Sequence, residues 1–134
     1  MVTLQDIESY LLRSEADVQE LEEGIWYVHT GSSEAGEPRP GLVVTFQPPV
    51  VVMRADIRDL PLDDEEQLQL YRRLLELNAR ELVHGAYGLE DGEIILSDTL
   101  ELENLDFSEF RASLESLALA ITSHLPGLTL EISE

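Results

Sequence analysis

The residues best suited to catalysis or metal binding are scattered along this sequence. His29, His84 and His124 are far apart, and none has a second histidine four residues away that would place two imidazoles on one helix face. Ser32-Ser33 lies in a glycine-containing stretch but lacks the G-x-S-x-G spacing of a nucleophile elbow. These residues therefore predict neither a metal site nor nucleophilic catalysis.

Adjacent carboxylates are the other possible source of chemistry. Glu22-Glu23 falls at a predicted turn, while Asp63-Asp64 and Glu65-Glu66 open a predicted helix. A catalytic carboxylate pair needs one member in an apolar environment that raises its pKa, whereas these positions favour solvated charge. Asp91-Gly92-Glu93 lacks the alternating oxygen ligands of an EF-hand loop, and the sequence has no dinucleotide fingerprint or phosphate loop. We expect no enzyme activity, no catalytic residue and no cofactor.

The charge of the chain narrows its range of partners. Its 134 residues include 28 acidic and 8 basic ones, giving a net charge of −20, and every basic residue is arginine. Such a field repels nucleic acid and anionic membrane surfaces. The absence of lysine and cysteine excludes Schiff-base chemistry, thiol chemistry and disulfides. With no apolar run near the roughly 18 residues of a membrane span, the composition predicts one soluble cytoplasmic domain over residues 1–134.

The first half of the chain has one helical pattern followed by short strand patterns. Thr3 and Asp6 form a capping-box pair, Glu23-Gly24 is a hairpin signal, and Pro48-Pro49 interrupts an apolar β-branched run. We expect a helix over 3–14, strands over 18–21, 25–30, 42–46 and 50–55, and an exposed loop over 30–40.

A leucine-rich helix is predicted from about Asp64 to Arg80. Leu70, Leu74 and Leu77 form one apolar stripe, and a second stripe contains Leu68, Leu75 and Leu82, with Tyr71 on the same side. A helix packed on one sheet needs a single stripe. Either this helix lies inside the domain, or another chain covers one stripe. We favour a homodimer and assign Leu70, Leu74 and Leu77 to its interface.

The second half contains the clearest hairpin. With Asp91-Gly92 as a type I′ turn, Tyr87 faces Leu96 and Leu89 faces Ile94, so the large apolar residues share one face. Asp106 and Glu109 form a second capping box, which opens a helix that we expect Pro126-Gly127 to stop. For the tail after residue 127 two alternatives stay open, a short edge strand and a frayed end.

These elements predict an α+β fold. The order is α-β-β-β(-β)-α-β-β-α, with three helices and an antiparallel sheet of five to six strands. No internal repeat and no domain linker interrupts it.

The stretch from Leu77 to Leu105, LNARELVHGAYGLEDGEIILSDTLELENL, resembles the YbjN-like family, which is similar in fold to the dimeric class I type III secretion (Tir-type) chaperones. The similarity rests on an asparagine near the helix end, a strand containing Gly and Tyr, an Asp-Gly turn and an acidic, leucine-rich entry into the last helix. It falls on Asn78, Gly85, Tyr87, Asp91-Gly92, Ile94, Leu96, Leu102 and Leu105. The resemblance implies a non-enzymatic homodimer whose apolar surfaces hold an extended segment of a partner, without implying a role in secretion.

The partner surface is expected in the strands between residues 25 and 55. Proline-marked breaks there predict a strand at a sheet edge to which a peptide can add. The residues assigned to pockets for that peptide are Trp26, Val28, Val44, Phe46 and Met53. The alternative for the same residues is packing in the core. A different class of function also stays open, an acidic decoy whose carboxylates imitate DNA phosphates and occupy a basic DNA-binding protein.

Overall fold

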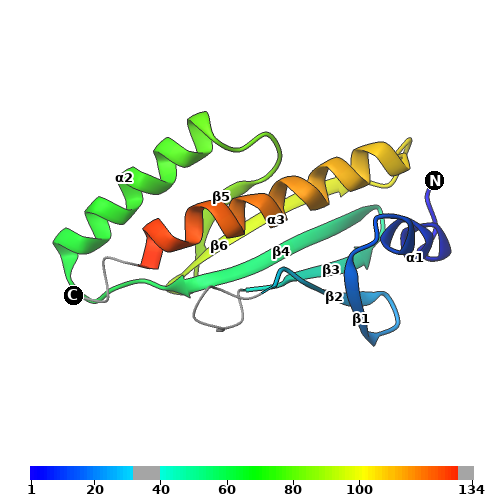
Figure 1. Cartoon of the computed structure of the whole chain (residues 1–134), viewed down its shortest axis with the longest axis horizontal. Coiled ribbons are helices and arrows are strands. Elements are labelled where there is room, and N and C mark those ends of the chain that lie inside the picture. The colour runs from blue at the N-terminus through cyan, green and yellow to red at the C-terminus, as the bar shows by residue number, and fades with distance from the viewer. Residues whose placement is uncertain (32–39, 130–134) are drawn as a thin grey trace.

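A computed structural model describes residues 1–31 and 40–129 of the chain, without the side chains of residues 125–127 and 129. It contains three helices and six strands (Figure 1). They are α1 (Leu4–Arg13), β1 (Asp17–Glu22), β2 (Ile25–His29), β3 (Leu42–Gln47), β4 (Val50–Asp59), α2 (Asp64–Arg80), β5 (Ala86–Glu90), β6 (Glu93–Glu101) and α3 (Phe107–Thr129). The predicted fold class and element order are confirmed.

Helix starts follow the capping signals in the sequence. The Thr3 hydroxyl accepts a hydrogen bond from the Asp6 N–H, and the Asp6 carboxylate accepts one from the Thr3 N–H. Asp63 caps α2 through the Glu66 N–H, and the Asp106–Glu109 pair makes the same reciprocal bonds before α3. These side chains satisfy backbone donors that a helix start leaves without partners.

The six strands form one antiparallel sheet in the order β1-β2-β3-β4-β6-β5. Its edges are therefore β1 and β5. The expectation of an edge strand between residues 25 and 55 is wrong, because β2, β3 and β4 each pair on both sides. Pro48-Pro49, which has a cis peptide bond, lies instead in the tight turn that joins β3 to β4, with Gln47 opposite Val50.

The register of the β5–β6 hairpin agrees with the prediction from its turn. Tyr87 faces Leu96, Gly88 faces Ile95, and Leu89 faces Ile94. Asp91 and Gly92 both have positive φ, as a type I′ turn requires. The sequence therefore determined which face of this hairpin points into the core.

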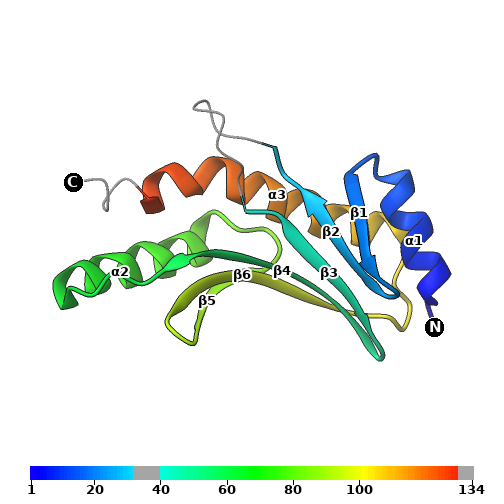
Figure 2. The ribbon, with the colours of Figure 1, turned by 90° about the horizontal axis from the view of Figure 1, so that it is seen from below.

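The helices lie on one side of the sheet. In Figure 2 β1 and β2 pass in front of α3, and α2 lies beside β5; α3 also contacts β4 and β6. α1 packs against α3, where Tyr10 meets the rings of Phe107 and Phe110 at centroid distances of 5.7 and 5.5 Å. The core fills the space between this layer and the sheet, and the other face of the sheet carries no helix among the described residues.

One predicted boundary is wrong. α3 continues through Pro126-Gly127 to Thr129, because proline has a φ close to the helical value and a helix can continue across the one missing backbone bond. The tail residues 130–134 and most of the predicted loop, residues 32–39, lie outside the described residues. None of the helices in the described part is long and apolar enough to cross a membrane.

Candidate protein-binding surfaces

The residues with catalytic potential do not converge in the described part of the chain. It contains no group of three or more His, Asp or Glu side chains placed to hold a metal ion. His29 stacks on Tyr27 in β2, at a centroid distance of 4.7 Å. His124 lies on α3, where its Nδ1 is 2.8 Å from the Tyr87 hydroxyl. These two histidines therefore serve packing and hydrogen bonding in this structure.

Four of the five residues assigned to partner binding are in the core. Trp26, Val28, Val44 and Met53 have at most 3% of their surface exposed, and their side chains point to the helix-covered face of the sheet. Phe46 is half-buried against the same core. A peptide on the face of the sheet without helices would not touch these four side chains. Their position agrees with the alternative of packing in the core.

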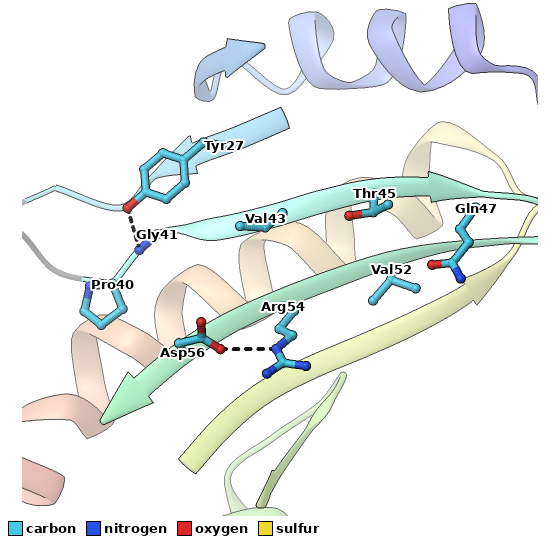
Figure 3. A pocket seen from close by; sticks show the side chains of 9 residues that line it. All are labelled: Tyr27, Pro40, Gly41, Val43, Thr45, Gln47, Val52, Arg54 and Asp56. Carbon is cyan, nitrogen blue, oxygen red and sulfur yellow. Dashed lines mark hydrogen bonds and ion pairs between the residues drawn. The ribbon is translucent and has the colours of Figure 1, made fainter. Parts of the chain in front are cut away.

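The opposite face of the same strands is open and hollowed. A cleft with a volume of about 440 Å³ is lined by outward residues of β2, β3 and β4, whose side chains Figure 3 shows. Tyr27 closes one end, where its hydroxyl accepts a hydrogen bond from the Gly41 N–H at 3.0 Å. A Cβ at Gly41 would lie 2.3 Å from the Tyr27 ring, so this close approach requires glycine. The floor of the cleft is mixed, with Val43 and Val52 beside polar side chains.

Arg54 lies in this cleft and is engaged by two carboxylates. Its guanidinium is 2.6 Å from Glu90 on β5 and 3.2 Å from Asp56 on β4. The hydrogen bond to Glu90 is the main cause that raises the pKa of Arg54, so the charge is permanent. Because both carboxylates neutralise its charge, Arg54 links β4 to β5 across β6 and offers little attraction to an anionic ligand.

A second groove lies between α2 and β5. It has a volume of about 330 Å³ and an almost wholly apolar lining of Tyr71, Leu74, Leu75, Asn78, Tyr87, Gly88 and Leu89. Leu75 is 68% exposed and Leu89 is 49% exposed, and Leu68, two turns earlier on α2, is 60% exposed. An exposed apolar surface of this kind is typical of a contact with another protein.

The structure divides the two leucine stripes of α2 between inside and outside. Leu70, Leu74 and Leu77, the residues assigned to the dimer interface, are at most 5% exposed and pack in the core. Leu74 is also part of the groove. Leu68 and Leu75, from the second stripe, face outward. The outward stripe was visible in the sequence, but its spacing alone did not tell which stripe the domain itself would cover.

Asn78 joins α2 to the edge of the sheet. Its side-chain carbonyl accepts a hydrogen bond from the Tyr87 N–H at 2.8 Å, and its NH₂ donates to the Tyr87 carbonyl at 3.1 Å. The two bonds hold the groove at a fixed width, because they connect one wall to the other. In the sequence, Asn78 was part of the resemblance to the YbjN-like family, but nothing there indicated that its side chain would bind the β5 backbone.

The whole chain is similar to one protein family and to several solved structures. The CesT_Tir_1 family model matches residues 1–133. A chain of the heterodimeric ExoU–SpcU complex from the type III secretion system of Pseudomonas aeruginosa superimposes with a TM-score of 0.64 at 15% identity, covering 90% of this chain and 95% of that one. No protein of curated function matches the chain.

Two further structures share the fold. YbjN from E. coli has a TM-score of 0.62 at 13% identity and covers 93% of this chain and 92% of its own. A chain of the ExsC–ExsE complex has a TM-score of 0.59 at 13% identity, with coverage of 96% and 97%. At these identities the superpositions establish the fold alone. The resemblance seen in residues 77–105 is confirmed.

Proposed function

The chain belongs to the CesT_Tir_1 family, and from this membership we propose that it is a protein-binding homodimer with a chaperone-like or adaptor role toward a partner protein. The role is non-enzymatic and needs no cofactor, nucleic acid or membrane, and it is exercised in the cytoplasm. The fold and the surfaces that the fold leaves uncovered support this role.

The observation that carries the homodimer is the apolar groove between α2 and β5. Leu68 and Leu75 are more than half exposed on one helix, with Tyr71 between them. Burying such side chains is worth roughly 1.5–3 kcal/mol each. A second copy is the occupant that we propose, with Leu68, Tyr71 and Leu75 at the contact and Leu74 beneath them.

The charge distribution along α2 supports a second copy. Asp64, Glu65 and Glu66 lie in its first turn, whereas Arg72, Arg73 and Arg80 lie in its second half. A two-fold axis through the middle of the outward face would align two α2 helices antiparallel, with the acidic start of each beside the arginines of the other. These three arginines are the largest cluster in a chain that has only eight.

The partner protein is expected on other surfaces of the dimer. We propose that Trp26, Val28, Val44, Phe46 and Met53 act on binding through packing beneath the sheet, which keeps its outward residues in place. The cleft around Tyr27 and Arg54, and the sheet edge at β1, are then the surfaces available to an extended segment.

Light scattering tests the homodimer directly. The mass at micromolar concentration should be about twice 15.1 kDa. Leu75→Asp should give a folded monomer, because it places a charge in the groove. Leu12→Asp is the matched control, since Leu12 is 79% exposed on α1, away from the groove, and should leave the dimer intact. A monomeric wild-type chain, or equal dissociation by both variants, contradicts the proposed interface.

The acidic decoy is the rival function, favoured by the net charge of −20. The two functions differ in salt dependence, because Coulomb attraction between exposed charges weakens as the Debye length falls from about 10 Å at 0.1 M to 3 Å at 1 M salt. Partner capture in a pull-down should survive high salt if apolar grooves and backbone pairing carry it. Capture that disappears between low and high salt supports the decoy instead.

A further inference from the structure

One wall of the apolar groove between α2 and β5 is hydrogen-bonded to a third element, α3. Tyr87 lines the groove and is 6% exposed. Its hydroxyl lies 2.8 Å from Nδ1 of His124 on α3, and the centroids of the two rings are 5.9 Å apart. His124 itself does not line the groove. Tyr87 therefore connects the surface that we assign to the homodimer with an ionisable group of the same protomer.

Charged groups from two other elements flank His124. Glu81, at the end of α2, favours the charged form of the imidazole, whereas Arg73 on the same helix disfavours it. Arg58 of β4 binds the α3 backbone one turn beyond His124. From β5 the contact is Tyr87, whose hydroxyl keeps its proton because burial raises its pKa. Desolvation outweighs the attraction of Glu81, so the pKa of His124 lies below its ordinary value of 6.5.

The hydrogen bond between Tyr87 and His124 depends on the charge of the histidine. A neutral ring with its proton on Nε2 accepts from the Tyr87 hydroxyl at Nδ1, whereas a charged ring carries a proton on both nitrogens and can only donate. On protonation, the hydroxyl must therefore turn its own proton away from Nδ1. The two Asn78 bonds hold the backbone of Tyr87, not its phenol. Protonation of His124 thus loosens the side chain that forms the groove wall.

A second copy seated in the groove makes the charged form of His124 less favourable. It removes water from the outer side of Tyr87, Leu75 and Leu89, so the surroundings of the Tyr87–His124 pair become less polar. Loss of solvation favours the neutral form of an imidazole. The dimer then binds the proton less readily than the free protomer does, and by linkage the proton favours the free protomer. Dimerisation is therefore strongest above the His124 pKa of the free protomer and weakens as the pH falls through it.

We propose that His124 makes the homodimer sensitive to pH: the neutral ring holds Tyr87 in the groove wall and supports dimerisation, and the charged ring releases Tyr87 and favours the monomer. This inference rests on the proposed homodimer and names the regulation of that same interface. The regulating ligand is the proton.

The overall charge of the chain predicts the opposite pH dependence, which makes the sign of the effect informative. Each copy has a net charge of −20, so two copies repel each other. Acid protonates carboxylates, which titrate near pH 4 in model peptides, at roughly 3.9 for Asp and 4.3 for Glu. The field alone therefore predicts a tighter dimer at lower pH, whereas His124 predicts a weaker one.

Sedimentation equilibrium at about pH 7.5 and about pH 5.5, with the ionic strength held constant, tests the inference. His124→Asn keeps an acceptor near the position of Nδ1 and does not titrate, so it reports the background of the field. Relative to this variant, the dissociation constant of the wild-type dimer should rise about tenfold at the lower pH, because each dimer contains two such hydrogen bonds. His29→Asn is the matched control, since His29 is exposed on β2 and stacks on Tyr27, and it should behave as wild type. The same pH dependence in wild type and His124→Asn, or loss of the wild-type behaviour in His29→Asn, overturns the inference.

Tyr87→Phe tests the connection between the histidine and the groove, and it does so without any change at position 124. Phenylalanine keeps the ring in the groove wall and removes the hydroxyl, so most of the tenfold pH effect should disappear. A Tyr87→Phe dimer with the full effect contradicts the inference. Failure of the proposed function looks different: a wild-type chain that sediments as a monomer at pH 7.5 contradicts the homodimer itself. A dimer whose pH dependence does not involve His124 leaves that function standing and overturns only its regulation.

Discussion

Tyr87 is the residue at which three elements meet. Its backbone is bound by Asn78 of α2, its phenol by His124 of α3, and its ring lies 5.9 Å from the His124 ring. Burial raises the pKa of Tyr87 far above its ordinary value, so its hydroxyl keeps its proton. When the His124 ring is neutral with its proton on Nε2, Nδ1 accepts a hydrogen bond from that hydroxyl, whereas a protonated ring can only donate, so the bond is sensitive to the charge of the histidine.

Stability should depend on pH through His124. Desolvation lowers the pKa of His124 below its ordinary value of 6.5; the nearby Glu81 opposes this shift, and Arg73 on α2 reinforces it. The folded state therefore binds the proton less readily than the unfolded chain does. The stabilising contribution is complete above pH 6.5 and is lost as the pH falls from 6.5 through the lowered folded-state pKa.

His124→Asn isolates this contribution, because asparagine places an acceptor near the position of Nδ1 and does not titrate. Urea denaturation at several pH values between 5 and 8 should show a stability difference, wild type minus variant, that decreases as the pH falls. Taking the difference removes the opposite trend from carboxylate protonation, which lowers the self-repulsion of the chain. A difference that is constant with pH would show that His124 is not coupled to folding.

At the scale of elements, the start of the β5–β6 hairpin is fitted tightly against α3. Gly85 has a φ of +81°, and a Cβ there would lie 2.6 Å from the Leu117 side chain and 2.9 Å from the Ser97 carbonyl oxygen. Gly92, at the tip of the same hairpin, also has a φ of +81°, but a Cβ at Gly92 would have no other atom within 4 Å. The two glycines therefore share the same backbone strain and differ in space.

Replacing each glycine with alanine should separate these two effects. Gly92→Ala should cost about 1–2 kcal/mol, the usual penalty for a side chain in the left-handed region. Gly85→Ala should cost a further ~1–3 kcal/mol, because Leu117 and the β6 backbone must move. Urea denaturation measures both changes in the free energy of unfolding. Equal losses at the two positions would mean that α3 yields to the added methyl group without cost.

The elements also show which parts of the fold could be predicted from sequence. Capping boxes and the Asp91-Gly92 turn are local signals, and they gave correct helix starts and the correct hairpin register. The order of strands in the sheet and the stripe of α2 that faces the core depend on tertiary packing. The spacing of residues along the chain does not reveal either of them. We therefore expected an edge strand between residues 25 and 55, and we assigned the buried stripe of Leu70, Leu74 and Leu77 to the dimer interface.

The candidate surfaces were harder to predict than the fold. Alternation along β2, β3 and β4 identified two faces but did not show that the face with Trp26 and Met53 is the covered one. Asn78 and Tyr87 are nine residues apart, and their contact depends on how α2 returns along β5. Distances of this kind follow from the path of the chain in space.

For the molecule as a whole, charge is the dominant feature. Among the described residues, Arg54 pairs with Asp56 and Glu90 and Arg111 pairs with Glu115, while the sequence as a whole has 28 acidic residues against 8 basic ones. Arg13 lies over the Phe107 ring at 3.9 Å and so contributes to packing rather than to charge pairing. Mutual repulsion between carboxylates therefore opposes the compact state.

Added salt should stabilise the protein. Raising NaCl from about 20 to about 200 mM shortens the Debye length from roughly 20 to roughly 7 Å and screens this repulsion, so the melting temperature should rise. Thermal unfolding followed by circular dichroism measures the change, with sucrose at matched osmolality as a control for general solvent effects. A melting temperature that is flat or falls with salt would mean that the carboxylates are paired more evenly than the described ion pairs indicate.

The strand order has a consequence for the chain as it leaves the ribosome. β1 to β4 form a meander in which each strand can pair with the previous one as soon as it emerges. The other side of β4 pairs with β6, which is synthesised later, because β4 ends at Asp59 and β6 begins at Glu93. At about 5–20 residues per second, β6 follows on the order of 2–7 s later. During that interval one side of the valine-rich strand β4 (Val50–Asp59) has no partner strand. The nascent chain is therefore most prone to pair wrongly with other chains at β4, although β4 lies inside the finished sheet.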